Sequence, residues 1–345
     1  MNNLKKIGLT ALAGSLVATS VMAVEMGVSG TAEVTYTTKG GKGNGISSDS
    51  GNPFGSNTSL SFSGEGDVGF GTAKIVRTIG DNMNDAATAS NEYLSAWQTV
   101  DMGDLGTFKF DSTGGAITGL RSNRDKLPTA YEEVWTGVSS HGILSAGSDN
   151  VLGYSNTYSG VTVDLAHARG NSEGGTGDGA TGSTSTGSAT DWYVTVDSGT
   201  MGVDGLILGL GHSDINSDLQ DLADGNNLDS STVLAHANYS TGPVSLGVRY
   251  VSTKASAAGA EEIVLEAAAI AYNINDALTV SYAEQDRMFD RSGGTVDVTE
   301  SSKAFNANYT VGAASVRATL AESSDAAGVA GNKDEHMEIS LVLSF

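Results

Sequence analysis

Hydrophobic and polar residues alternate one by one along much of the chain. The last nine positions show it well, with apolar side chains at Met337, Ile339, Leu341, Leu343 and Phe345 and polar ones at most positions between them. The same two-residue period recurs near 28–37, 244–250, 278–282, 304–309 and 314–320. Successive side chains of a β-strand point to opposite faces, so each segment is predicted to be a strand with one apolar and one polar face.

Two kinds of connector alternate between these strands. Short turns, which carry the Gly, Asn or Asp that tight turns need, lie near 66–69, 103–106, 158–161, 198–204, 240–243, 273–276 and 310–313. Long polar connectors lie near 40–57, 81–91, 113–149, 171–190, 213–230, 255–260, 288–298 and 323–334. Seven short turns and eight long connectors join about sixteen antiparallel strands, with the short turns at one end of the sheet and the long loops at the other.

This asymmetry is typical of an all-β fold that crosses a membrane as an antiparallel β-barrel, with short periplasmic turns and long extracellular loops. In a bilayer every backbone polar group must be paired within the protein, so the sheet must close on itself. The apolar face then meets lipid and the polar face surrounds a lumen. About sixteen strands are too many for their own side chains to fill, so we expect an aqueous channel.

The first residues predict export from the cytoplasm. Residues 1–6 carry two lysines, 7–21 form an uncharged apolar run, and 21–23 (VMA) offer a cleavage site of small or modest residues. We interpret residues 1–23 as a cleaved Sec signal peptide and 24–345 as the barrel domain, exported through the periplasm to the outer membrane. A retained helical anchor is the alternative, but the apolar run is short for a membrane span.

Composition narrows the function. The 345 residues include 40 acidic and 18 basic ones, a net charge of −22, which repels nucleic acid. Without cysteine there are no disulfides or thiolate metal sites. No Gly-x-Ser-x-Gly sequence stands in a strand-turn-helix context and no His-Glu-x-x-His pattern occurs, so an enzyme is not expected. No cofactor is expected either, although loop carboxylates leave open a bound Ca²⁺ ion.

The whole mature chain resembles the Gram-negative general porins. The features that carry the resemblance are the signal peptide, the opening GVSGTAEV at 27–34, the strand count, the long third connector and the final alternating strand. The resemblance implies a homotrimer in outer-membrane lipid that lets ions and small hydrophilic solutes diffuse passively through a water-filled channel. In such proteins the barrel-assembly machinery reads a terminal phenylalanine, which makes Phe345 the implied assembly signal.

A different class of protein remains as the alternative. A secreted acidic surface-layer or adhesin-type structural β protein shares the richness in Gly, Ser, Thr and Asp. Such repeat proteins show a fixed period, whereas the strand spacing here varies and short links alternate strictly with long ones. The connectors therefore favour the barrel.

The resemblance also implies that the third long loop, residues 113–149, folds into the barrel as a constriction, where its acids face basic residues on the wall. We expect Glu132 and Glu133 to be the acids at the constriction, with Asp125 behind them. The alternative is that they are ordinary solvated loop charges.

The alternation of polar and apolar residues along the strands predicts which wall residues line the constriction. The residues expected to line it from the wall are Lys74, Lys109, Asp111, Arg249 and Arg317. By the same reasoning Glu33 and Glu266 point inward, whereas Arg77 points toward lipid or a neighbouring subunit. The acidic excess in the loops predicts a mild preference for cations.

Overall fold

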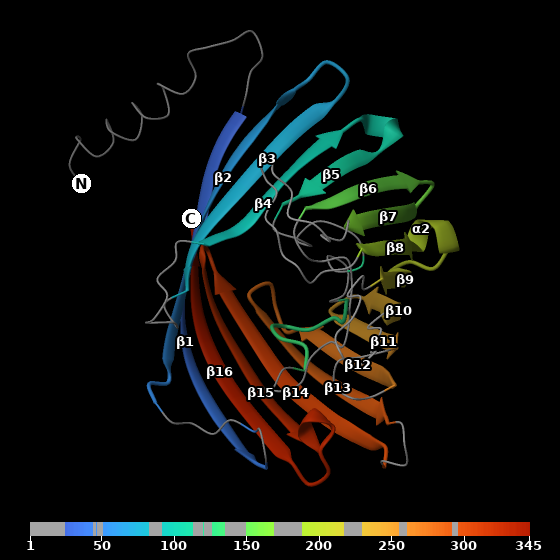
Figure 1. Cartoon of the computed structure of the whole chain (residues 1–345). Helices are drawn as coiled ribbons and strands as arrows, with labels where there is room; N and C mark the ends of the chain where they lie inside the picture. Colours follow the sequence, from blue (N-terminus) through green and yellow to red (C-terminus); the bar gives the residue numbers. More distant parts are fainter. Residues whose placement is uncertain are drawn as a thin grey trace, which may run out of the picture.

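The computed structural model describes residues 25–43, 46, 51–82, 92–112, 120, 126–134, 150–168, 188–216, 230–254, 261–291 and 296–345. These residues form one closed antiparallel barrel of sixteen strands, in which each strand pairs with its sequence neighbours and β1 pairs with β16 (Figure 1). The predicted all-β barrel is confirmed. The strands are β1 (Glu25–Lys42), β2 (Phe54–Asp67), β3 (Thr72–Asn82), β4 (Glu92–Asp101), β5 (Thr107–Asp111), β6 (Val151–Tyr158), β7 (Val161–Ala168), β8 (Ser188–Val196), β9 (Leu206–Asn216), β10 (Ser230–Thr241), β11 (Val244–Lys254), β12 (Glu262–Asn273), β13 (Leu278–Asp290), β14 (Val298–Val311), β15 (Ala314–Ser324) and β16 (Lys333–Ser344).

All seven predicted short turns join consecutive strands, and they do so at one end of the barrel. Gly242 and Gly312 adopt positive φ values of 53° and 59° in two of them, a conformation that glycine reaches without a Cβ clash. The turn between β8 and β9 contains the helix α2 (Ser198–Met201), whose first turn is capped by Asp197. Short 3-10 turns, η1 (Gly103–Leu105) and η3 (Ala326–Gly328), follow β4 and β15. Within the described ranges, no helix combines the length and apolar character that crossing a membrane requires.

The two faces of the barrel differ as the alternation predicts. Large apolar side chains remain exposed on the outer face, among them Leu246, Val248, Phe305 and Leu320. Residues paired across neighbouring strands share a face, so the register extends this assignment around the wall. The exposed apolar belt is what contact with hydrocarbon requires.

One assignment from the sequence is wrong. Glu266 pairs with Tyr250 on β11 and Asp286 on β13, and it is exposed on the outer face together with them. The physical reason is that β12 is apolar on both faces, because its inward positions, from Ile263 and Leu265 to Ala271, are apolar as well. Alternation of polarity therefore does not identify the inner face of this strand.

The seam of the barrel lies between β1 and β16, which pair from Thr31 with Ser344 to Lys42 with Lys333. Phe345 extends this ladder, since its carbonyl accepts from the Gly30 N–H at 2.8 Å and its own N–H donates to the Gly30 carbonyl at 3.0 Å. A Cβ on Gly30 would lie 2.6 Å from the Phe345 ring. Glycine at position 30 thus lets the ring lie against the β1 backbone.

Candidate functional site

Residues 126–134 of the third long connector (the inner segment) lie inside the barrel against the wall formed by β10–β16 (Figure 1). Side chains from three strands hold the backbone of this segment, namely Asn238 on β10, Ser281 on β13 and Asn306 on β14. Ser281 accepts a backbone N–H at 2.8 Å and Asn306 donates to a backbone carbonyl at 2.7 Å. The segment is therefore fixed to the wall along its length.

A buried ion pair adds to this attachment. The Arg249 Nη1 atom on β11 lies 2.5 Å from the Glu133 Oε2 atom, and the exposed fractions of the two residues are 2% and 8%. The other carboxylate oxygen of Glu133 accepts the Leu127 N–H at 3.2 Å. One carboxylate thus joins both ends of the inner segment to β11, in an environment where losing either charge is costly.

The wall beneath the inner segment is largely apolar, with alanines at many positions. Pro128 lies directly over Gly247 on β11, where a Cβ would collide with its ring. Leu127 and Val134 belong to one buried cluster with wall residues of β8 and β10–β15, which are Tyr193, Leu234, Val251, Leu265, Ala267, Ala269, Ala283, Ala304 and Ala321. The loop and the wall thus pack as a hydrophobic core inside a lumen that is otherwise polar.

Tyr131 connects the inner segment to β15 and β16, the last two strands of the barrel. Its hydroxyl donates to the Glu338 Oε1 atom on β16 at 2.6 Å, and the Arg317 guanidinium carbon on β15 lies 5.5 Å from the centre of its ring. Burial and the hydrogen bond to Glu338 raise the pKa of Tyr131 well above its ordinary value. The hydroxyl therefore remains protonated, and remains a donor, through the alkaline range.

Tyr131→Phe is expected to increase the preference of the channel for cations. The ring under Arg317 stays, whereas Glu338 loses a hydrogen-bond donor and presents a less compensated negative charge to the lumen. The reversal potential in a salt gradient measures this preference. In the parent protein Tyr131 stays protonated, so it should not shift the reversal potential between pH 8 and pH 10. Tyr309→Phe, on the outer face of β14, is the matched control. An unchanged reversal potential in Tyr131→Phe would contradict this role.

The remaining predicted wall residues lie on the opposite part of the barrel. In the circular strand order, β3 and β5 stand eight strands away from β11 and β13. Lys74 on β3 pairs with Glu65 at 3.3 Å, and Lys109 on β5 pairs with Asp164 at 2.9 Å. Asp111 is completely buried at the end of β5. These lysines thus have acidic partners on their own wall.

The structure brings Arg249, Glu133 and Arg317 together at the inner segment, with the Glu132 carbonyl bound to β14. Asp125 lies outside the described residues. Sequence reasoning missed Tyr131 and Glu338. Glu338 shares its parity with Ser340 on the final strand, so alternation alone would have pointed it inward.

The long acidic loops are the place where the sequence leaves open a bound Ca²⁺ ion. Among the residues that the structure describes, no group of three or more His, Asp or Glu side chains is arranged to hold a metal ion. Most residues of the loops between β7 and β8 and between β9 and β10 lie outside the described ranges, so loop-bound Ca²⁺ stays a sequence-based expectation.

Comparisons with known proteins agree with this architecture. The family model described as Gram-negative porin matches residues 8–344. OmpF of Salmonella typhi, solved in complex with daunomycin, is similar in structure, with a TM-score of 0.70, 13% identity and coverage of 93% of this chain and 97% of that one. A variant of the Rhodopseudomonas blastica porin has a TM-score of 0.59 and 14% identity over 93% and 100% of the two chains. A comparison with curated protein sequences gave no match.

Proposed function

This chain belongs to the Gram-negative porin family, and on that premise we propose that residues 126–134 form the constriction of its channel. The protein is an outer-membrane porin that serves passive diffusion. The observation that carries the proposal is the buried pair of Arg249 and Glu133, which holds the inner segment against the lumen side of the wall. The arrangement supports transport of ions and small hydrophilic solutes down their gradients, with no catalytic step and no cofactor.

Selectivity in such a channel follows from the width of the pore and the charges that line it. On one side of the lumen the acids and bases of the inner segment and its wall compensate each other, as do Lys74 with Glu65 and Lys109 with Asp164 on the other side. This balance supports weak selectivity, tilted toward cations by the acidic excess of the whole chain.

Lys109→Glu is expected to shift the reversal potential toward stronger cation selectivity. The substitution replaces the cationic partner of Asp164 by a second acid on the inner wall. The protein is reconstituted into a planar bilayer with a salt gradient, where stepwise conductance tests the channel itself and the reversal potential tests its selectivity. Lys303→Glu, the same charge change on the outer face of β14, serves as the control and should leave the reversal potential unchanged. Equal values in the two variants would remove Lys109 from the lining of the pore.

A homotrimer, proposed from the family resemblance, is supported by an arginine on the outer face of β3. Arg77 on β3 lies opposite Phe62 on β2, and its guanidinium donates to the carbonyls of Val76 and Trp97 at 2.9 and 3.3 Å. An arginine that faces lipid at mid-bilayer costs about 2–4 kcal/mol, which a neighbouring subunit would relieve. The mass of the purified protein in detergent tests this proposal. Recognition of Phe345 by the barrel-assembly machinery is a proposal on the same resemblance.

A further inference from the structure

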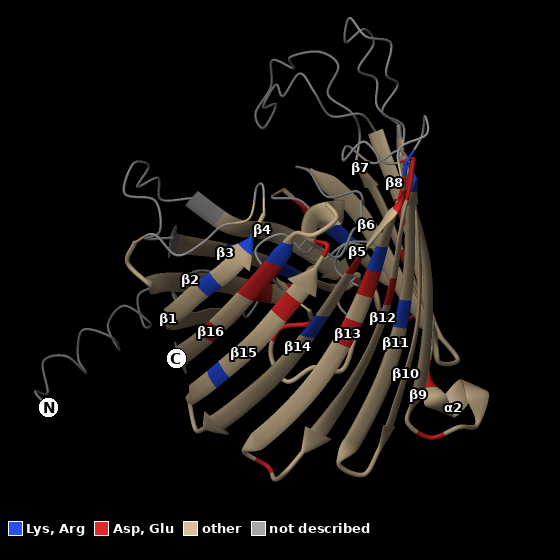
Figure 2. Ribbon diagram, turned by 90° about the horizontal axis from the view of Figure 1, so that it is seen from below, with Lys and Arg blue, Asp and Glu red and all other residues tan. Residues whose placement is uncertain are grey.

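Three neighbouring strands, β15, β16 and β1, carry side chains of opposite charge on the lumen side, next to the inner segment. Arg317 on β15 lies opposite Ser340 on β16, and Ser340 lies opposite Thr35 on β1. Glu33 is two residues from Thr35, and Glu338 is two residues from Ser340. Figure 2 shows acidic and basic positions on both β15 and β16. One guanidinium and two carboxylates therefore share a small area of the inner wall (the Arg317 site).

The Tyr131 side chain of the inner segment lies at the centre of this area. The Arg317 guanidinium carbon is 5.5 Å from the centre of its ring, a distance at which a cation interacts with an aromatic face. Its hydroxyl donates to the Glu338 Oε1 atom at 2.6 Å. Burial and this hydrogen bond raise the pKa of Tyr131, and the nearby charges of Glu338, Glu132 and Glu33 raise it further. Charges of both signs thus surround one aromatic side chain.

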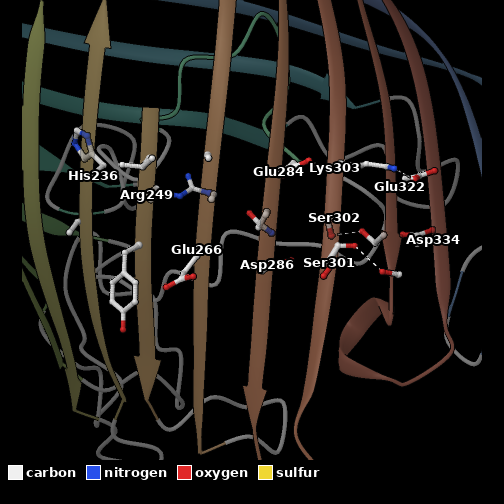
Figure 3. A pocket seen from close by; sticks show the side chains of 18 of the residues that line it. His236, Arg249, Glu266, Glu284, Asp286, Ser301, Ser302, Lys303, Glu322 and Asp334 are labelled. Atoms are coloured by element: carbon white, nitrogen blue, oxygen red, sulfur yellow. Dashed lines mark hydrogen bonds and ion pairs between the residues drawn. The ribbon is translucent and has the colours of Figure 1, made fainter. Parts of the chain in front are cut away.

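The guanidinium of Arg317 is available to a ligand. Other basic residues of this half of the barrel have acidic partners, since Arg249 pairs with Glu133 and Lys303 pairs with Glu322 at 2.7 Å on the outer face (Figure 3). In the part of the chain that the structure describes, Arg317 forms no ion pair and donates no hydrogen bond. Its side chain is half-buried. The aromatic ring beneath it covers one face of the guanidinium and leaves the N–H groups at its edge for a carboxylate.

The two carboxylates differ in what they can still accept. Both oxygens of Glu338 are in use, because Oε1 accepts the Tyr131 hydroxyl and Oε2 accepts the Thr37 hydroxyl at 3.2 Å. Glu33 accepts the Ser340 hydroxyl through Oε1, whereas its Oε2 atom has no partner among the described residues. Glu33 is also half-buried, so this oxygen is open to the lumen. Glu33 is therefore the acceptor for a cationic group.

The separation of Arg317 and Glu33 suits a small dipolar solute. The register places their backbones two strands apart across the sheet and two residues apart along it, which corresponds to about 12 Å. Both side chains are long and point into the lumen, so their charged ends are closer together than that. A solute whose ammonium and carboxylate groups are about 3 Å apart, with a hydrogen bond of about 2.8 Å at each end, spans about 8 Å. Such a solute can bind both charges at once.

Solutes with a single charge fit this area less well. An anion is attracted by Arg317 but repelled by Glu33 and Glu338, and for a cation the signs are reversed. A neutral solute forms neither charged contact. Complementary charges within one small area therefore select a molecule that carries both.

We propose that the Arg317 site binds small zwitterionic α-amino acids on their way through the channel, with the carboxylate on Arg317 and the ammonium on Glu33. This assignment rests on the proposed function, because a site on the lumen wall meets solutes only if the channel conducts them. Tyr131 orients the guanidinium from below, so the inner segment helps to form the site. Both ligand-binding groups are half-exposed, so binding is weak enough to release the solute and speeds entry at low concentration.

Uptake into liposomes that contain the protein tests the proposal with four solutes of nearly equal size. L-alanine carries both charges, L-lactate only the carboxylate, L-alaninamide only the ammonium at mildly acidic pH, and L-lactamide neither. At low concentration L-alanine is expected to enter about fivefold faster than L-lactamide, since exposed charge pairs contribute roughly twofold to fivefold each. An excess of unlabelled glycine should abolish this advantage without slowing L-lactamide.

Two variants should shift the preference in opposite directions. Glu33→Gln keeps an oxygen that accepts the Ser340 hydroxyl but removes the charge, so the advantage of L-alanine should fall about threefold and the ratio of L-lactate to L-alaninamide uptake should rise. Arg317→Gln should reduce the advantage of L-alanine to a similar extent and lower that ratio. The matched control is Glu65→Gln on β2, which faces the lumen eight residues nearer the short-turn end, opposite Glu25. It should leave the ratio of L-alanine to L-lactamide uptake unchanged.

Stepwise single-channel conductance is measured for every variant, because it shows that the barrel has folded and that the channel is open. Equal rates for L-alanine and L-lactamide through conducting channels would overturn the Arg317 site and leave the proposed channel in place. The same loss of preference in Glu65→Gln as in Glu33→Gln would also overturn it. A parent protein without conductance would contradict the proposed function itself, and the site with it.

Discussion

Arg249→Met is expected to release the inner segment from the wall, with the largest effect of any single substitution in the lumen. Removal of the guanidinium leaves the Glu133 carboxylate buried without its cation, and breaking a buried pair from one side costs about 3–5 kcal/mol. The steady single-channel current should become noisy and pass through several conductance levels as the segment moves. Planar-bilayer recordings measure this, and limited proteolysis within residues 126–134 gives an independent readout.

The double variant Arg249→Met with Glu133→Gln separates charge from packing. The amide oxygen of glutamine still accepts the Leu127 N–H, and neither side chain then carries a buried charge. Replacing a buried ion pair as a whole is often close to neutral, so a steady current should return. A quiet channel of parental conductance in Arg249→Met alone would show that the other wall contacts suffice to hold the segment.

Gly247→Leu is expected to lower the single-channel conductance substantially. Pro128 occupies the space in which any side chain at position 247 would stand, so the leucine pushes the inner segment toward the axis of the lumen. Overfilling a packed site of this kind costs about 1–3 kcal/mol, which a barrel with an extensive hydrogen-bonded wall tolerates. The lumen narrows while the strands remain paired.

Conductance at high salt measures the narrowing, and far-ultraviolet circular dichroism shows whether the barrel remains folded. Ala318→Leu, which enlarges an outward side chain on β15, is the control and should conduct like the parent protein. Gly247→Leu with unchanged conductance in a folded barrel would place Pro128 away from the narrowest part of the channel.

The strands were predictable because a half-buried sheet imposes a period of two on polarity. The seven short turns and the eight long connectors together predicted about sixteen strands, and the barrel confirms this number. The same rule failed at Glu266, because the inner segment covers the lumen side of β12 and that side is therefore apolar too. Alternation identifies the inner face only where water occupies the lumen.

The contacts of the inner segment were predictable only in part. Sequence placed Arg249 and Glu133 on the wall and on the loop, but a direct contact between them depends on how residues 126–134 pack on the alanines of β12–β15. Tyr131 and Glu338 are 207 positions apart, and no local pattern couples them. A sequence pattern predicts which face of a strand a side chain occupies. Which residue that side chain contacts across the lumen depends on how the whole barrel closes.

Because β1 pairs with β16, the barrel can close into a channel only after β16 has been synthesised. A polypeptide interrupted ahead of that strand leaves the edges of β1 and β15 without partners, and bare edges are costly in a bilayer. Unfinished translation products are thereby prevented from becoming leaks, so the ladder that shapes the wall also protects the permeability barrier of the cell.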